Sequence, residues 1–278
     1  MRTCKSSLSS GVLVGILLVA ATFSGCETDP VENTEPGFSD TFIPEANRKF
    51  RYTVESDGES AGTATQWITG RKDSAGIAIF NLHTDIQAAG NLMTMDNKMF
   101  SLAGKTYNEI GIPKAWQMSI NLLNQMPDVR VTKAELFGFP AFIAIDNAIR
   151  DGSALTKAGP AEQGQKVSYI SHGEAASMEQ VLSFDPGKAT VETIRVPAGS
   201  FVCSRFSYTN KQKITISTKD GKYTGDGEER IILWVAHGIG MVKQESAGTL
   251  VTLVPLPTGE IRKITTTSTS KTTLQEII

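Results

Sequence analysis

The chain has 278 residues, of which 40% are hydrophobic and 20% are charged, and this composition is typical of a globular protein. Its 27 basic and 29 acidic residues nearly balance, so the overall charge gives no indication of nucleic-acid binding. An aromatic content of 7% and regular apolar runs exclude a fully disordered chain. Three cysteines are too few for a disulfide scaffold.

Residues 1–25 have the pattern of an export signal. Arg2 and Lys5 form a positive head, and an uncharged apolar run, Gly11–Phe23, follows them. That run is too short to span about 30 Å of hydrocarbon, which takes about 20 residues in a helix. We therefore expect a signal peptide in this region.

The end of the apolar run resembles the lipobox of bacterial lipoproteins. Ser24 and Gly25 precede Cys26, although Phe23 stands where that family usually has leucine. The resemblance implies that Cys26 is acylated and becomes the mature N-terminus. An ordinary secretory signal is the alternative. Because no later apolar run is long enough to span a membrane, the acyl chains would be the only anchor.

Residues 26–44 are rich in acidic and turn-forming side chains and predict a flexible stalk. Acidic residues directly after the cysteine also resemble the surface-export signal of Bacteroidota lipoproteins. A coil of this length reaches roughly 20–25 Å. We expect it to hold one β-rich domain, residues 45–278, at the outer membrane, on either its periplasmic or its surface-exposed face.

The rest of the chain predicts strands with almost no helix. One short helix is expected between Pro113 and Pro127, where Trp116, Ile120 and Leu123 recur at helical spacing. Closely spaced β-branched runs without helical crossovers indicate a mainly β protein with a single antiparallel sheet or open β-barrel. The expected strands are Lys49–Glu55, Thr63–Thr69, Gly76–Leu82, Met93–Met95, Lys98–Leu102, Phe139–Ile145, Val167–Ser171, Glu179–Phe184, Thr190–Val196, Phe201–Tyr208, Lys213–Thr218, Glu229–Val235, Gly240–Glu245, Thr249–Val254 and Ile261–Thr267.

Glycine, proline and asparagine clusters predict the turns between these strands. Among them are Asp96–Asn97, Gly225–Gly227 and Ala247–Gly248. Phe139–Ile145 is continuously apolar, which favours a strand buried on both faces. Ala148–Gln165, rich in glycine, alanine and proline, is expected to be a long loop.

Two segments carry a resemblance to a family. Val196–Cys203 reads VPAGSFVC, and Trp234–Lys243 reads WVAHGIGMVK. Together they are similar to the paired signature of the TapB-like exported β-proteins, which usually has threonine in place of Ser200 and valine in place of Ile239. The resemblance implies a β fold and export, and it implies no agreed activity.

We interpret both segments as structural, with a binding role as the alternative. Pro197 and Gly199 suit a turn between two strands, and Gly238 and Gly240 permit a bulge or a close backbone approach. Cys203 has apolar neighbours and is expected to be a small buried hydrophobe. The candidate residues of the two segments are Pro197, Gly199, Cys203, Trp234, His237, Gly238, Gly240 and Lys243.

Other motifs lack the context that their chemistry needs. Gly58–Gly62 matches the G-x-S-x-G nucleophile elbow, but Ser60 lies in a predicted hairpin and not between a strand and a helix. Gly159–Lys166 resembles a phosphate-binding loop without the serine or threonine that follows the lysine. Lys211 and Lys213 form a small basic strand face, which we interpret as solvated.

The histidines also indicate no reactive site. His83, His172 and His237 are scattered and have no zinc-ligand spacing. His237 is interpreted as a partly exposed surface residue, with a catalytic base as the alternative. The sequence therefore predicts no catalytic residue, no metal and no cofactor.

Two functions from different classes follow. The first is a lipid-anchored, noncatalytic envelope protein that binds a protein partner or has a structural role. The alternative is a carrier of an acyl chain or other apolar ligand in a half-open barrel. Leu92–Phe100 and Leu136–Ile145, with their methionines and phenylalanines, would then line a cavity and not fill a core. An envelope hydrolase is a third, weaker hypothesis.

Overall fold

The computed structural model describes residues 39–88, 90–256 and 260–278. The predicted signal peptide, Cys26 and most of the predicted stalk lie outside these residues.

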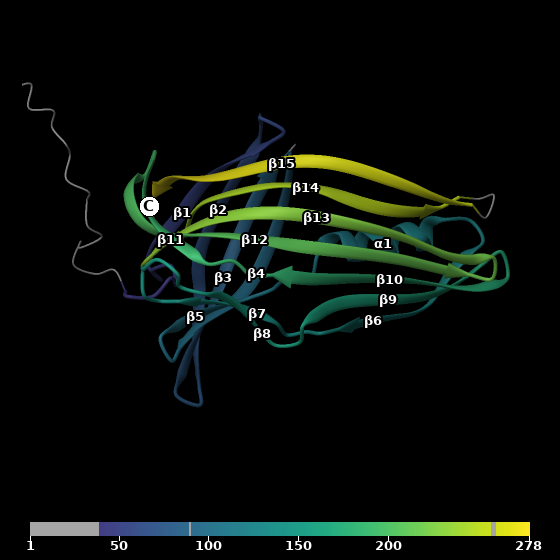
Figure 1. The fold of residues 1–278 in the computed structure, drawn as a ribbon, viewed down its shortest axis with the longest axis horizontal. Helices are drawn as coiled ribbons and strands as arrows, with labels where there is room; N and C mark the ends of the chain where they lie inside the picture. Colours follow the sequence, from purple (N-terminus) through teal and green to yellow (C-terminus); the bar gives the residue numbers. More distant parts are fainter. Residues whose placement is uncertain (1–38, 89, 257–259) are drawn as a thin grey trace, which may run out of the picture.

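The described chain forms one antiparallel sheet of fifteen strands with a single helix, which confirms the predicted fold class (Figure 1). The elements are β1 (Lys49–Ser56), β2 (Glu59–Ser74), β3 (Ile77–Ala88), β4 (Asn91–Leu102), β5 (Lys105–Glu109), α1 (Lys114–Gln125), β6 (Val129–Phe137), β7 (Phe142–Asp146), β8 (Leu155–Ala158), β9 (Glu162–Ser171), β10 (Glu174–Asp185), β11 (Ala189–Val196), β12 (Gly199–Thr218), β13 (Gly221–Ala236), β14 (Gly240–Pro255) and β15 (Ile261–Ile277).

Four long strands, β12 to β15, run through both halves of the sheet, and the shorter strands pair at one end or the other. The strand order is β6-β9-β10-β12-β13-β14-β15-β1-β2-β3-β4-β5-β7-β8, with β11 paired to β12. Residues 199–206 of β12 pair with β11, and residues 209–217 pair with β10. We call the part with β1–β5, β7, β8 and β11 the curled half, and the part with β6, β9, β10 and α1 the extended half (Figure 1).

The curled half bends until its two ends meet. Ala154, just before β8, forms an isolated antiparallel bridge with Lys188, just before β11. The amide of Ala189 donates to the carbonyl of Ser153 at 2.8 Å. These contacts join strands that are distant in the sheet order and enclose the inner face of this half.

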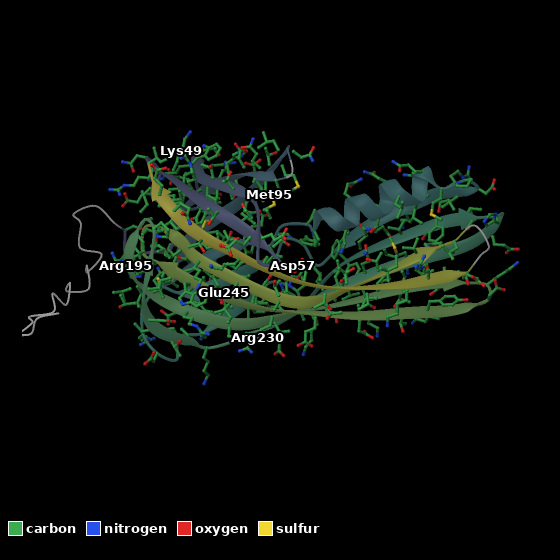
Figure 2. The ribbon with its side chains drawn as sticks, turned by 90° about the horizontal axis from the view of Figure 1, so that it is seen from above. Lys49, Asp57, Met95, Arg195, Arg230 and Glu245 are labelled. Atoms are coloured by element: carbon green, nitrogen blue, oxygen red, sulfur yellow. The ribbon has the colours of Figure 1, made fainter. Side chains whose placement is uncertain are left out.

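In the extended half, α1 covers one face of the sheet (Figure 2). Leu123 of α1 packs with Ile214 and Ile216 of β12 in one buried cluster. The side-chain amide of Gln165 donates to the backbone carbonyl of Trp116 at 3.2 Å and fixes the start of the helix on the sheet. The helix lies where the spacing of Trp116, Ile120 and Leu123 predicted it. It is neither long enough nor apolar enough to cross a membrane.

Three predicted turns are wrong because the strands run through them. Asp96–Asn97 lies inside β4, Gly225–Gly227 inside β13 and Ala247–Gly248 inside β14. A Cβ atom on Gly248 would lie 2.4 Å from the carbonyl oxygen of Glu228, and one on Gly227 would lie 2.7 Å from that of Thr249. These glycines therefore permit close approach of neighbouring strands and do not reverse the chain.

The predicted loop Ala148–Gln165 is also wrong in part, since it contains β8 and the start of β9. Gln165, at the end of that predicted loop, is 3% exposed, and its side-chain amide donates hydrogen bonds to Trp116 and Gln180. The strand predicted at Phe139–Ile145 begins only at Phe142. Ala144 and Ile145 are its buried residues. Because adjacent residues point to opposite faces of the sheet, the strand is buried on both faces at these two positions only.

Candidate ligand cavity

The curled half contains a cavity of about 340 Å³ with a mainly apolar lining. This volume is at the lower end of the range of about 300–1,000 Å³ found for ligand pockets. The cavity is lined by Phe42, Pro44, Val54, Ala64, Gln66, Leu82, Thr84, Ile86, Met95, Met99, Thr106, Asn108, Ile143, Ile145, Tyr208, Leu233, Val235, Gly240, Met241, Gln244 and Thr272. Both apolar segments proposed in the carrier hypothesis contribute, through Met95, Met99, Ile143 and Ile145.

The alternation of side chains along each strand makes the cavity apolar. On β3, Leu82 and Ile86 line the cavity, whereas His83 lies within hydrogen-bond distance of Asp85 and Asp96 on the other face. On β13, Leu233 lines the cavity, and Trp234 packs on the opposite face. None of the lining residues carries a formal charge.

A methionine row on β4 runs from solvent into this interior. Met93 and Met95 are 39% and 37% exposed, whereas Met99 is 5% exposed. These residues share one face of the strand, because their spacing is even. Figure 2 shows Met95 on the side of the curled half that faces α1. Met95 and Met99 thus contribute apolar side chains to the cavity from β4, with the polar Asn97 between them on the same face.

The segment that enters the domain covers another part of the cavity. Phe42 is 1% exposed, and its amide donates to the hydroxyl of Thr106 at 3.1 Å. Gly238 donates its amide to the carbonyl of Thr41 at 2.8 Å and accepts from the amide of Glu45 at 2.9 Å. A Cβ on Gly240 would lie 3.2 Å from both the Phe42 carbonyl oxygen and the Pro44 side chain.

The structure brings the two candidate segments together. Val196, Phe201 and Cys203 of the first segment share one buried cluster with Trp234 and Ile239 of the second. Pro197 lies in the turn between β11 and β12, and Gly199 has a φ of +143° where β12 begins. Burial raises the pKa of the Cys203 thiol to about 12, so the thiolate is strongly disfavoured.

Trp234 of the second segment contacts residues on three strands. Its indole Nε1 donates to Glu192 Oε2 at 3.0 Å. The Lys243 ammonium lies 4.6 Å from the ring centroid, and the Arg205 guanidinium lies 5.4 Å from it. This tryptophan therefore joins β11, β12 and β14 through one side chain.

His237 also makes structural contacts. Its Nε2 lies 2.6 Å from the backbone carbonyl oxygen of Asn147, and because a carbonyl only accepts, this nitrogen must carry the proton. Its ring packs against Phe42 at a centroid distance of 4.9 Å. His237 and Gly238 thus hold the segment that contains Phe42 against the domain.

The remaining sequence motifs lie apart from the cavity. Ser60 is exposed on β2, and β3 follows that strand where an elbow would have a helix. Lys166 lies within β9, which is not the loop-to-helix context of a phosphate-binding loop. Lys211 pairs with Asp185 at 3.1 Å, and Lys213 lines an open groove with carboxylates among its lining residues.

His83 lies between two carboxylates on the outer face of the curled half. Its Nδ1 is 2.7 Å from Asp96 Oδ1, and its Nε2 is 3.0 Å from Asp85 Oδ1. The hydrogen bond to Asp96 contributes most to raising the His83 pKa.

His172, in contrast, lies in the β9–β10 turn, 3.9 Å from Asp128. In the described ranges, no group of three or more metal-binding side chains is placed to hold an ion.

Several cavity residues were not identified from the sequence. Phe42, in the range predicted to be stalk, lines the cavity and is 1% exposed, and its neighbour Ile43 packs in a buried cluster and is 7% exposed. Their apolar pair within an acidic stretch is the signal that could have identified them. Gln66, Thr84 and Asn108 line the cavity only because of strand register, and the sequence contains no comparable signal for them.

A DUF3108-like family model matches residues 142–250, which include both candidate segments. No curated protein matches the chain. Two solved structures align with most of this chain. One is from Bacteroides fragilis, described as an inferred exported protein with a YmcC-like fold. It is 14% identical with a TM-score of 0.40, and the alignment covers 86% of this chain and 99% of that one. The other, an inferred lipoprotein from Parabacteroides distasonis, is 15% identical with a TM-score of 0.44, over 86% and 98% of the two chains.

Proposed function

We propose that this chain is a lipid-anchored, noncatalytic protein of the cell envelope that binds an acyl chain or a similar apolar ligand in the cavity of its curled half. The observation that supports this function is the mainly apolar cavity of about 340 Å³ enclosed by the strands. Transfer of apolar surface from water into such a site is favourable by about 25 cal/mol per Å². An architectural role without a ligand would need no such space.

The anchor would place this site close to a source of acyl chains. In the proposal, Cys26 carries lipid at the outer membrane, and the chain from Cys26 leads directly to the Phe42 segment beside the cavity. The Gly238 turn holds that segment in place. Because residues 41–45 are held against the domain, the free part of the stalk would reach less than the roughly 20–25 Å expected for residues 26–44 and would keep the cavity near the head groups.

The noncatalytic part of the proposal is supported by the state of the candidate nucleophiles and bases. Cys203 is buried as a protonated thiol. His237 has its Nε2 proton committed to a backbone carbonyl. Ser60 is exposed on a hairpin strand. None of these groups faces the cavity lining.

Photo-crosslinking tests the cavity in the full chain in its membrane. A diazirine-bearing acyl probe should crosslink to peptides from β3, β4, β7 and β13, which mass spectrometry can map. Leu233→Trp fills the cavity and should reduce crosslinking at least tenfold. Ile232→Trp, the adjacent residue on the outer face, should retain it. Equal crosslinking of both folded variants, or none in the wild type, would reject the binding function.

The anchor is tested separately. Cys26→Ser should remove incorporation of labelled palmitate and leave the protein soluble or unprocessed, because the acyl chains on Cys26 are the proposed anchor. Ser24→Ala, which keeps a small residue before the cysteine, is the matched control and should remain lipidated. Unchanged mass and fractionation of Cys26→Ser would contradict the lipid anchor.

A further inference from the structure

We infer that the ligand's polar end is an uncharged hydrogen-bond donor, a hydroxyl or an amide, and that Asn108 accepts its hydrogen bond. This inference rests on the proposed binding function and specifies its ligand class. It distinguishes neutral acyl compounds, such as monoacylglycerols, from fatty acids and acyl phosphates.

The cavity offers no counter-charge to an ionised ligand. Every lining residue is uncharged. The charged side chains of β3 and β14 point to the outer face, where His83 pairs with Asp85 and Lys243 pairs with Glu245. An ionised group moved from water into this lining would lose hydration without gaining an ionic partner, which is strongly unfavourable.

One polar atom in the lining lacks a partner. The side-chain oxygen Oδ1 of Asn108 is buried, and it has no hydrogen-bond partner among the described residues. Asn108 lies on β5, and its register neighbours on the two adjacent strands are Met99 and Ile143, which also line the cavity. The unpaired acceptor is therefore surrounded by apolar side chains at the cavity wall.

An unpaired buried acceptor selects for a donor. A hydroxyl or an amide N–H can donate to Asn108 Oδ1, whereas a carboxylate or an ionised phosphate offers only acceptor oxygens. Two other polar pairs of the lining are already made. The Gln66 amide donates to the Thr84 hydroxyl at 3.2 Å, and Thr106 donates to Asn147 at 2.7 Å. Asn108 Oδ1 is thus the buried acceptor of the lining whose unmet hydrogen bond a ligand can satisfy.

Competition against the photo-crosslinking probe tests the ligand class. Glycerol monolaurate and laurate have the same acyl chain, and at pH 8 the laurate carboxyl is ionised. We expect glycerol monolaurate to halve crosslinking at a concentration at least tenfold below that of laurate. Equal potency of the two competitors would overturn the inference.

Substitution of Asn108 tests the acceptor itself. Asn108→Leu should raise the required concentration of glycerol monolaurate about five- to tenfold, the loss expected for one buried hydrogen bond, and should leave that of laurate unchanged. Asn81→Leu, on the exposed outer face of β3, is the control and should change neither concentration. Each competitor is compared between the wild type and the variants in the same vesicles, so its membrane partitioning is the same in every such comparison.

The outcomes separate the inference from the proposed function. Suppose that the acyl probe crosslinks to cavity peptides, but glycerol monolaurate halves crosslinking at no lower concentration than laurate. The binding function then stands and the inference fails. The inference also fails if Asn108→Leu leaves the lower concentration of glycerol monolaurate unchanged. If the probe does not crosslink to cavity peptides at all, the binding function itself fails.

Discussion

On β12, Tyr208 lines the cavity of the curled half, whereas Ile214 and Ile216, on the same face farther along, pack beneath α1. The same sheet face is therefore used in two ways. In the extended half a helix is laid on the sheet, and Leu123 fills the space above the strands. In the curled half the sheet bends over itself, and its own strands form the opposite wall.

The difference shows how a space can remain unfilled in a folded chain. A helix packed on a sheet brings large side chains into contact with it, and interiors of this kind are close-packed. Opposing walls of a curled sheet are held apart by the strands between them. Ala64, Thr84 and Thr272 contribute small side chains to those walls. The cavity lined by Leu82 and Leu233 thus lies in the half without a helix.

Matched truncations in the two halves give the largest expected difference. Leu123→Ala removes a 3%-exposed side chain from a filled core and should lower the free energy of unfolding by about 2–5 kcal/mol. Leu233→Ala enlarges a space that already exists, and should cost only about 1–2 kcal/mol. Urea unfolding of both variants measures the difference. Equal losses would mean that Leu233 is packed as tightly as Leu123, which would contradict an unfilled interior.

The sequence predicts the local structure better than the division into halves. Alternating β-branched runs predict most strands, and the spacing of Trp116, Ile120 and Leu123 predicts α1. Sequence alone does not reveal that Gly227 and Gly248 lie inside strands, because glycine also favours turns, and the distinction depends on a neighbouring backbone. The curl depends on contacts such as the Ala154–Lys188 bridge, which no local pattern encodes.

The same limit applies to the candidate site. The methionines and isoleucines of two apolar segments indicated a possible lining, but the residues gave no basis for choosing between a filled core and a cavity. Asn108 has no sequence signal, since its importance comes from its register with Met99 and Ile143. Residues whose roles depend on closure of the sheet become visible only in the folded structure.

A pair of glycine substitutions should separate strain from loss of the cavity wall. Gly240 and Gly76 have φ values of +76° and +80°, so valine at either position should cost about 1–3 kcal/mol of stability. Gly76 has open space around it, whereas a side chain at Gly240 would press on Phe42 and Pro44. Only Gly240→Val should therefore weaken acyl-probe crosslinking, by several-fold. Similar crosslinking in both variants would show that the Phe42 segment does not close the cavity.

The smallest expected effect concerns the outer face of the curled half, through the pH dependence of stability. Asp96 and Asp85 raise the pKa of His83 in the folded state, so its contribution is fully present below the unfolded pKa of about 6.5. That contribution is lost as pH rises through the folded pKa. Because the site is near the surface, we expect less than about 1 kcal/mol.

Thermal unfolding between pH 5 and pH 8 measures this effect. The melting temperature of the wild type should fall slightly more over this interval than that of His83→Gln, since the variant lacks the titrating ring. His172→Gln in the extended half is the control, because that ring lies 3.9 Å from Asp128 in an exposed turn. If the melting temperature of the wild type changes with pH as that of His83→Gln does, but differently from that of His172→Gln, the pH-dependent contact lies in the extended half. The ion pairs of His83 with Asp96 and Asp85 would then contribute nothing measurable to the curled half.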